Sequence, residues 1–297
     1  MIGLRLLERL AAPVSAMMLP PASMRFDFLH PSGEAALVGP DSLSWRIFKN
    51  PVTLFIGGVG AVILELAEPA VRSGVWDHSS FRQDAVTRLR RTGAAAMMTV
   101  YGPAGAAREM IARVVRMHDK VSGTTPDGQP YHANDERLLD WVQATASYGF
   151  IEAYSRFARP LSDAERSTAF AEGAPAAQLY GAVGAPLSTA EWEALFARTL
   201  PRLERSSIVF DFLSIMNEAP LLPRPMRWLQ RMLVKAAIDI VPAVLRERLG
   251  IAQMTPSAPE RAAARMMARI ADRLPLREAP PAQASMRMGR DAAFLYR

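Results

Sequence analysis

The chain has 297 residues, of which 50% are hydrophobic and 22% are charged, so it can bury a sizeable core and lacks the composition of a disordered protein. It contains no cysteine, which excludes disulfides, thiolate chemistry and iron–sulfur clusters. The net charge of +6 comes almost entirely from arginine, because Lys49, Lys120 and Lys235 are the only lysines. No basic tract or RNA-binding aromatic pattern accompanies this charge, so we do not expect a nucleic-acid partner.

Residues 1–40 are predicted to form an N-terminal extension that begins with a short amphipathic helix. Glu8 and Arg9 interrupt its apolar residues, so it does not read as a signal peptide. The helix is expected to dock on the domain, with peripheral contact to a membrane surface as the alternative. The longest apolar run, residues 52–64, is shorter than the ~20 residues that span a bilayer, so we predict no transmembrane helix and a cytoplasmic protein. The apolar residues of the amphipathic helix are Ile2, Leu4, Leu6, Leu7 and Leu10.

From Ser42 onward the apolar residues recur with the period of a helix, and Gly and Pro fall between the periodic segments. This pattern predicts an all-α fold with a single multi-helix domain over residues 41–275 and a loosely ordered tail over 276–297. Three helix starts carry a Ser-x-x-Glu capping box: Ser162 with Glu165, Ser188 with Glu191, and Ser257 with Glu260. The predicted helices cover 53–67, 80–101, 104–121, 135–159, 162–181, 188–200, 206–219, 224–249 with a break near 240–242, and 257–274.

A glycine-rich run, Gly57-Gly58-Val59-Gly60, follows an apolar segment in a way that imitates a dinucleotide-binding turn. The third glycine of that motif is replaced by Ile63, and no second strand ending in an acidic residue follows. We therefore favour small residues that let another helix or a flat ligand approach the backbone.

His118 lies on the apolar face of the predicted helix 104–121, at 100° per residue. Two interpretations remain open from the residues alone. A histidine on an apolar face is commonly a core residue whose ring bonds a backbone carbonyl. Alternatively, the imidazole points into a dry cavity and serves as an axial metal ligand. Its apolar neighbours are Ala107, Ile111, Val114 and Val115, and the opposite face carries Arg113, Arg116 and Lys120.

The preceding helix places Arg88, Arg91, Thr92, Ala95 and Thr99 on one face. The small residues that follow the arginines would let a flat ligand lie against the helix while Arg88 and Arg91 meet its carboxylates. A solvated arginine cluster behind an alanine-rich helix contact explains the same pattern equally well.

The loop after the His118 helix leads into another helix start. Asn134 is predicted as its N-cap, and His132 in the loop is expected to be exposed. Leu138, Trp141, Val142 and Thr145 then form an inward-facing stripe.

Taken in order, several short motifs resemble the MpaB/rubber oxygenase family, over roughly residues 40–250. These are Asp77-His78-Ser79-Ser80-Phe81, Arg88-x-x-Arg91-Thr92, Tyr101-Gly102, Val115-Arg116-Met117-His118, Tyr131-x-Ala133-x-Asp135 and Leu139-x-Trp141-Val142. The resemblance implies an all-α domain enclosing a non-covalent haem b (iron) pocket, with His118 as the proximal metal ligand. It also implies that Arg88, Arg91 and Thr92 line the distal side of the cofactor. Arg91 stands where latex-clearing proteins have a lysine, so a distal lysine ligand is not expected here.

The resemblance further implies an oxygenase that acts with O2 on a hydrophobic, isoprenoid-like alkene, with Arg88 and Thr92 in catalytic positions that orient oxygen or the haem propionates. The alternative function is a helical protein that binds haem or lipid without turnover.

Overall fold

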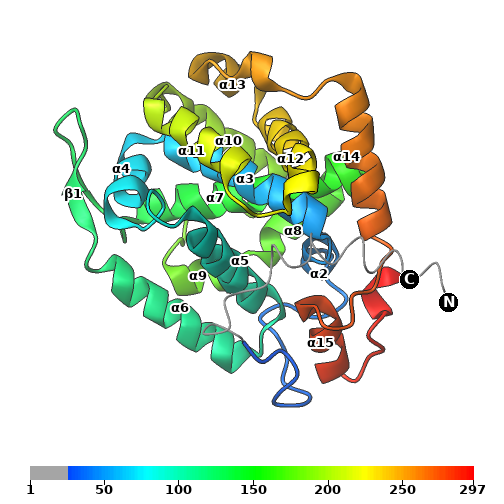
Figure 1. Ribbon diagram of the computed structural model, residues 1–297. Coiled ribbons are helices and arrows are strands. Elements are labelled where there is room, and N and C mark those ends of the chain that lie inside the picture. The colour runs from blue at the N-terminus through cyan, green and yellow to red at the C-terminus, as the bar shows by residue number, and fades with distance from the viewer. Residues whose placement is uncertain (1–25) are drawn as a thin grey trace.

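The computed structural model describes residues 26–297, and this part of the chain forms a single all-α domain, as predicted (Figure 1). One short antiparallel hairpin, β1 (Ser122–Thr124) with β2 (Pro130–His132), projects beside α4. The helices are α2 (Leu43–Phe48), α3 (Pro51–Ala67), α4 (Pro69–His78), α5 (Ala85–Tyr101), α6 (Ala104–His118), α7 (Glu136–Ala153), α8 (Asp163–Glu172), α9 (Ala174–Tyr180), α10 (Thr189–Thr199), α11 (Ser207–Glu218), α12 (Arg227–Ile240), α13 (Ala243–Leu249), α14 (Ala258–Ala271) and α15 (Pro280–Arg287), with a π-helical turn η2 (Tyr154–Ala158) after α7.

Helix α3 runs through the middle of the domain and packs mainly against α7 and α12 (Figure 1). Its glycines permit this packing. A Cβ on Gly57 would lie 2.8 Å from the carbonyl oxygen of Gly149, and a Cβ on Gly149 would lie 2.5 Å from that of Gly57. The glycine-rich run therefore serves a close helix crossing, which confirms the prediction that it admits a second helix and leaves no strand for a dinucleotide site.

Local capping rules account for most of the helix starts. Ser162 and Ser257 form complete capping boxes, as predicted. Ser188 accepts the Glu191 amide as expected, but the Glu191 carboxylate accepts from Leu187 N, so this box is shifted by one residue. The predicted break at 240–242 separates α12 from α13.

Two short helices, α2 and α4, were not predicted, and one predicted helix is divided in two. Helix α4 begins at Pro69, where the Glu68 carboxylate caps the amides of Ala70 and Val71, and α2 precedes α3. Gly173 divides the expected single helix over 162–181 into α8 and α9. These elements are short and are stabilised by tertiary contacts, so their apolar periodicity is too brief to read from the sequence.

The expectation of a loosely ordered tail over 276–297 was wrong. Arg287 on α15 is only 2% exposed, and its guanidinium donates to the carbonyl oxygens of Phe28, Glu34 and Tyr101. Lys49 donates to the carbonyl oxygen of Leu295 at 2.8 Å. Buried charge-assisted hydrogen bonds therefore fasten the tail to the domain. The amphipathic helix predicted within residues 1–10 lies outside the described residues.

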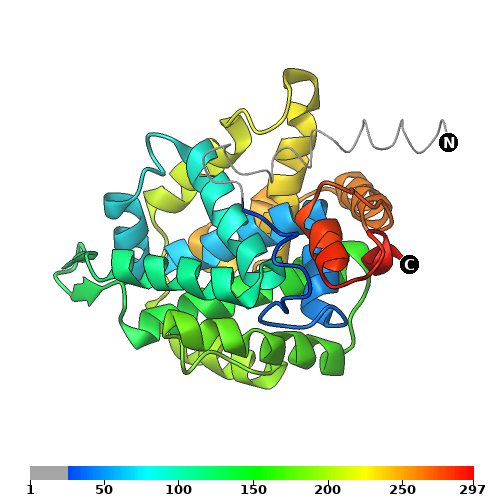
Figure 2. The same ribbon diagram turned by 90° about the horizontal axis from the view of Figure 1, so that it is seen from below.

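Helices α5 and α6 pack against each other on the side of the domain seen from below in Figure 2. No single helix among residues 26–297 is long and apolar enough to cross a membrane. Helices α3 and α4 reach that length and hydropathy only when they are counted together, and the chain bends by 110° at their junction.

Candidate functional site

His118 is the last residue of α6, and the helix places it as predicted. Ala107 and Ile111 on the same face are buried, whereas Arg113 and Arg116 on the opposite face are exposed. The imidazole is partly buried, and its Nδ1 atom is enclosed without a hydrogen-bond partner. The structure therefore does not show the Nδ1 atom of His118 bonded to a backbone carbonyl.

Asn134 is the neighbour whose side chain can form a hydrogen bond with the ring of His118. The sequence predicted it as the N-cap of α7, but Asp135 takes that role by accepting the amide of Arg137 at 3.0 Å. Asn134 instead donates its side-chain amide to the carbonyl oxygen of Val115 at 3.1 Å and to Asp119 Oδ1 at 2.7 Å. These bonds hold it against the last turn of α6.

The amide oxygen of Asn134 is a hydrogen-bond acceptor that suits the Nδ1 atom of His118. Asn134 Oδ1 is enclosed without a partner, as is His118 Nδ1. The amide lies close enough to raise the pKa of His118, which is the effect of an acceptor that favours the N–H form. A hydrogen bond from Nδ1–H to Asn134 would satisfy both groups and leave Nε2 with its lone pair.

The surroundings of His118 favour its neutral form. Burial lowers the pKa of the imidazole, and the positive charge of Arg88 lowers it further. Together these effects outweigh the opposing influences of Asn134 and Asp119. A neutral imidazole is the form that ligates a metal ion.

Glu65 on α3 is a second member of this site, and sequence analysis missed it. Burial raises the pKa of its carboxyl to about 7, against the opposing influences of Arg88 and the Thr145 hydroxyl. Arg88 responds to the same environment, because burial lowers its pKa and Glu65 raises it. Glu65, Arg88 and His118 thus form one electrostatically linked group drawn from α3, α5 and α6.

Glu65 also belongs to the accessible face of an otherwise buried helix. Within α3, Gly58, Val62 and Glu65 retain some accessible surface beyond the first residue, while the other positions are buried. The spacing of four and three residues puts these three on one face. This face of α3 therefore carries one carboxyl group, from Glu65, and a small apolar surface, from Gly58 and Val62. The available sequence signal was a lone acidic residue in an apolar helix.

The structure separates the predicted arginine stripe into two parts. Arg88 is partly buried and linked to His118 and Glu65, whereas Arg91 and Thr92 are exposed. The Thr92 hydroxyl donates to the carbonyl oxygen of Arg88 at 3.1 Å, within its own helix. Arg88 is thus the member of the stripe that the fold brings together with His118.

The other histidines are exposed, and among them His132 lies near His118, where its Nδ1 accepts from the backbone amide of Asn134 at 3.1 Å. His30 is exposed and paired with Asp27 at 2.9 Å, and His78 is exposed beside the Tyr131 ring. His132 is exposed, as predicted. Across residues 26–297, no three His, Asp or Glu side chains are grouped so that they could hold a metal ion.

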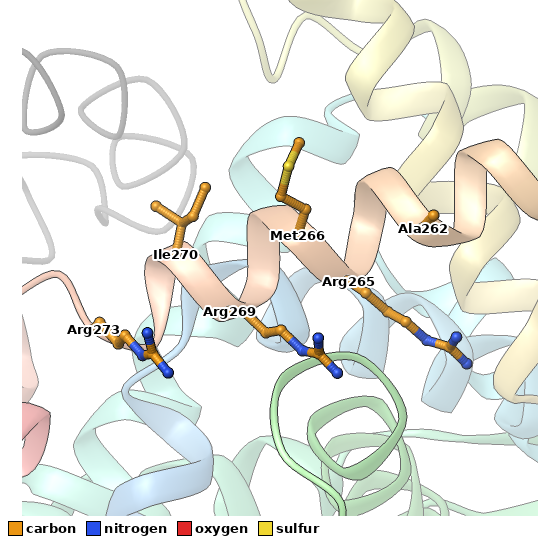
Figure 3. A pocket seen from close by; sticks show the side chains of 6 residues that line it. All are labelled: Ala262, Arg265, Met266, Arg269, Ile270 and Arg273. Atoms are coloured by element: carbon orange, nitrogen blue, oxygen red, sulfur yellow. The ribbon is translucent and has the colours of Figure 1, made fainter.

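Two surface grooves are lined by other residues. One, of about 410 Å³, follows the exposed face of α14 (Figure 3). The other, of about 510 Å³, lies between α7 and α10 and is lined by charged side chains such as Asp140 and Arg198. Neither groove includes His118, Arg88 or Glu65.

Comparison with known proteins identifies one family. The sequence pattern described as ER-bound oxygenase mpaB/B'/Rubber oxygenase, catalytic domain, matches residues 45–272. This range contains His118, Arg88 and Glu65 and covers most of the chain. No curated protein and no solved structure gives a significant match.

Proposed function

The chain belongs to the family of mpaB and rubber oxygenase catalytic domains, and on this premise we propose that it is a haem b-dependent oxygenase acting with dioxygen on a hydrophobic alkene. The observation that carries the proposal is the state of His118. Its ring is disposed to be neutral, and Nδ1 is enclosed beside an unsatisfied amide oxygen. A hydrogen bond from Nδ1–H to Asn134 would fix the tautomer of the ring and leave the lone pair of Nε2 free, so His118 is the residue that would hold the haem iron.

The residues present fit a haem better than an all-protein metal centre. A haem supplies four ring nitrogens of its own, so a single histidine suffices, in keeping with the lack of grouped ligands across the described residues. When bound at His118, the group would supply the redox chemistry that activates dioxygen.

Arg88 would provide the positive charge of the site. It is partly buried, and no ion pair joins it to an acidic side chain within residues 26–297. Such a guanidinium is suited to an anionic partner such as a carboxylate or an oxygen atom that gains negative charge. Arg91 and Thr92, which the family resemblance also assigns to the cofactor, are proposed here as outer residues at the accessible edge of the same helix.

Glu65 would hold a proton near the reacting groups. With a pKa of about 7, its carboxyl is shared between neutral and ionised forms at neutral pH. A group in this state can donate or accept a proton without a large energetic penalty in either direction. The apolar surface of Val62 on the same helix face would exclude water and suit a hydrocarbon substrate.

Two measurements test this function in sequence. The purified full chain, supplied with hemin, should show a Soret band and about one haem per chain by pyridine haemochrome analysis. A short polyisoprenoid incubated with the reduced protein under isotopically labelled dioxygen should then yield labelled carbonyl products. Labelled products support the oxygenase, and haem binding without them supports the alternative of a non-catalytic haem protein. A well-folded chain that gains no Soret band contradicts both.

A further inference from the structure

The outer face of α14 combines a row of arginines with two exposed apolar side chains. Arg265, Arg269 and Arg273 succeed one another at intervals of four residues, and their side chains extend in the same direction in Figure 3. Met266 and Ile270 rise from the adjoining side of the helix and are 60% and 46% exposed. At 100° per residue, all five lie within an arc of about 140°.

This row of arginines is not neutralised by the rest of the described chain. Arg269 and Arg273 form no ion pair within residues 26–297, and Arg265 bonds only to the carbonyl oxygen of Arg156. The acidic residue within α14 and the one at its C-cap are already engaged. Glu260 accepts from Lys235 at 2.7 Å, and Asp272 pairs with Lys49 at 3.4 Å. The face is therefore positive and open to an anionic partner.

The apolar residues decide which anionic partner fits. A polyanion such as a nucleic acid would satisfy the arginines but would leave Met266 and Ile270 in water or cover them with phosphate. A bilayer surface satisfies both rows, because apolar side chains enter the acyl boundary while arginines reach the lipid phosphates. We infer that the α14 face, defined as Arg265, Met266, Arg269, Ile270 and Arg273, docks on a membrane surface rich in anionic phospholipid.

This inference concerns a surface remote from His118 and does not depend on the proposed haem. It also differs from membrane contact through residues 1–10, which lie outside the described part of the chain. The two are separable by substitution, because changes on α14 leave the N-terminal residues intact.

Vesicle sedimentation with the full-length protein tests the inference. Vesicles of equal parts phosphatidylcholine and phosphatidylglycerol should bind the protein at low salt, whereas vesicles of phosphatidylcholine alone should bind it much more weakly. Replacing Arg265, Arg269 and Arg273 together with Gln should weaken binding to the anionic vesicles by on the order of a hundredfold. The double change Met266→Gln and Ile270→Gln should also weaken binding to the anionic vesicles. The dependence of that binding on salt concentration should stay the same, because the arginines are retained.

A matched control uses three arginines of α6. Arg108, Arg113 and Arg116 are exposed, form no ion pairs within residues 26–297, and lie on a helix away from α14 in both views (Figures 1 and 2). Their triple change to Gln alters the net charge equally and should change vesicle binding much less than the α14 variant does. Melting temperatures near that of the unsubstituted protein establish that all the variants fold.

Three results would overturn the inference. Equal loss in the α6 and α14 variants would mean that only net charge matters. Unchanged binding in both α14 variants would assign vesicle binding to the N-terminal residues. Binding that depends on the arginines but not on Met266 and Ile270, and that duplex DNA reproduces, would identify the face as a polyanion site.

Discussion

Glu65 of α3 and Arg88 of α5 influence each other's charge without forming a direct ion pair in the described structure. Arg88 holds the pKa of Glu65 lower than burial alone would set it, and Glu65 raises the pKa of Arg88 in return. His118 feels the same guanidinium, which lowers the pKa of its imidazole. Three titratable groups from three helices therefore share one environment, and Glu65 and Arg88 can each be tested by substitution.

Glu65→Gln should flatten the dependence of stability on pH. The folded-state pKa of Glu65 is raised to about 7 from an ordinary value near 4.5, so the folded protein binds the proton more tightly than the unfolded chain. The free energy of unfolding should therefore fall as pH rises through this window, by about 2 to 3 kcal/mol for this group. Urea unfolding at pH 5 and pH 8 should show this loss in the unsubstituted protein and much less of it in Glu65→Gln. Parallel pH profiles would contradict the raised pKa.

Arg88→Gln should raise the pKa of Glu65 further, because the guanidinium favours the ionised carboxyl. Arg91→Gln is the matched control, since Arg91 lies on the same helix but is exposed. Carboxyl NMR titration, with the Glu65 signal assigned by its absence from Glu65→Gln, measures the shift. Equal effects of the two arginine substitutions would mean that Arg88 holds no special position.

Substitutions of Asn134 should move the pKa of His118 in opposite directions. Asn134→Ala removes an acceptor that favours the N–H form, so the pKa of His118 should fall. Asn134→Asp keeps an acceptor and adds negative charge, so the pKa should rise. Imidazole proton NMR of the haem-free protein distinguishes these outcomes. Identical titrations in both variants would show that Asn134 does not interact with His118.

In the haem-loaded protein, Asn134→Ala should also weaken haem affinity by about 10- to 100-fold, as expected for loss of a partner that orients a metal ligand. Competition with apomyoglobin measures the change. An unaltered affinity together with a shifted pKa would place Asn134 beside the ring without a role in orienting it.

Two glycines of the α3–α7 region should respond oppositely to the same substitution. Gly149→Ala would place a Cβ 2.5 Å from the Gly57 carbonyl oxygen and should destabilise the fold by about 1 to 3 kcal/mol. The nearest atom to a Cβ on Gly58 is Phe150 Cε1 at 3.9 Å, so Gly58→Ala should stabilise it by about 0.5 to 1 kcal/mol. Thermal or urea unfolding of both variants checks the pair. A stabilised Gly149→Ala would mean that the helices do not cross as closely as described.

Features governed by near neighbours in the chain were predictable. The capping boxes at Ser162 and Ser257, the break before Pro242 and the apolar face that carries His118 all follow from spacings of a few residues. Asn134 marks the limit of such rules. Asn and Asp are equally good N-caps, so the sequence could not decide between Asn134 and Asp135.

Features that depend on distant segments were not predictable. From the sequence, Arg287 is expected to be an exposed residue of a polar tail. In the fold it is buried, because it donates to the carbonyl oxygens of Phe28, Glu34 and Tyr101. Glu65 likewise gains its raised pKa only because the fold buries its carboxyl group, and the nearby Arg88 only partly offsets that effect. Periodicity identified the helices that form the site, but tertiary packing determined which charges meet there.

The most direct test of the proposed function compares the haem content of His118→Ala with that of His132→Ala, a matched exposed histidine on the neighbouring hairpin. Both variants and the unsubstituted chain would be loaded with hemin and measured by Soret absorbance and pyridine haemochrome. We expect His132→Ala to retain about one haem per chain and His118→Ala to lose most of it, because only His118 combines a neutral, partly buried ring with an enclosed Nδ1. Equal haem content in the two variants would contradict the assignment of His118 as the iron ligand.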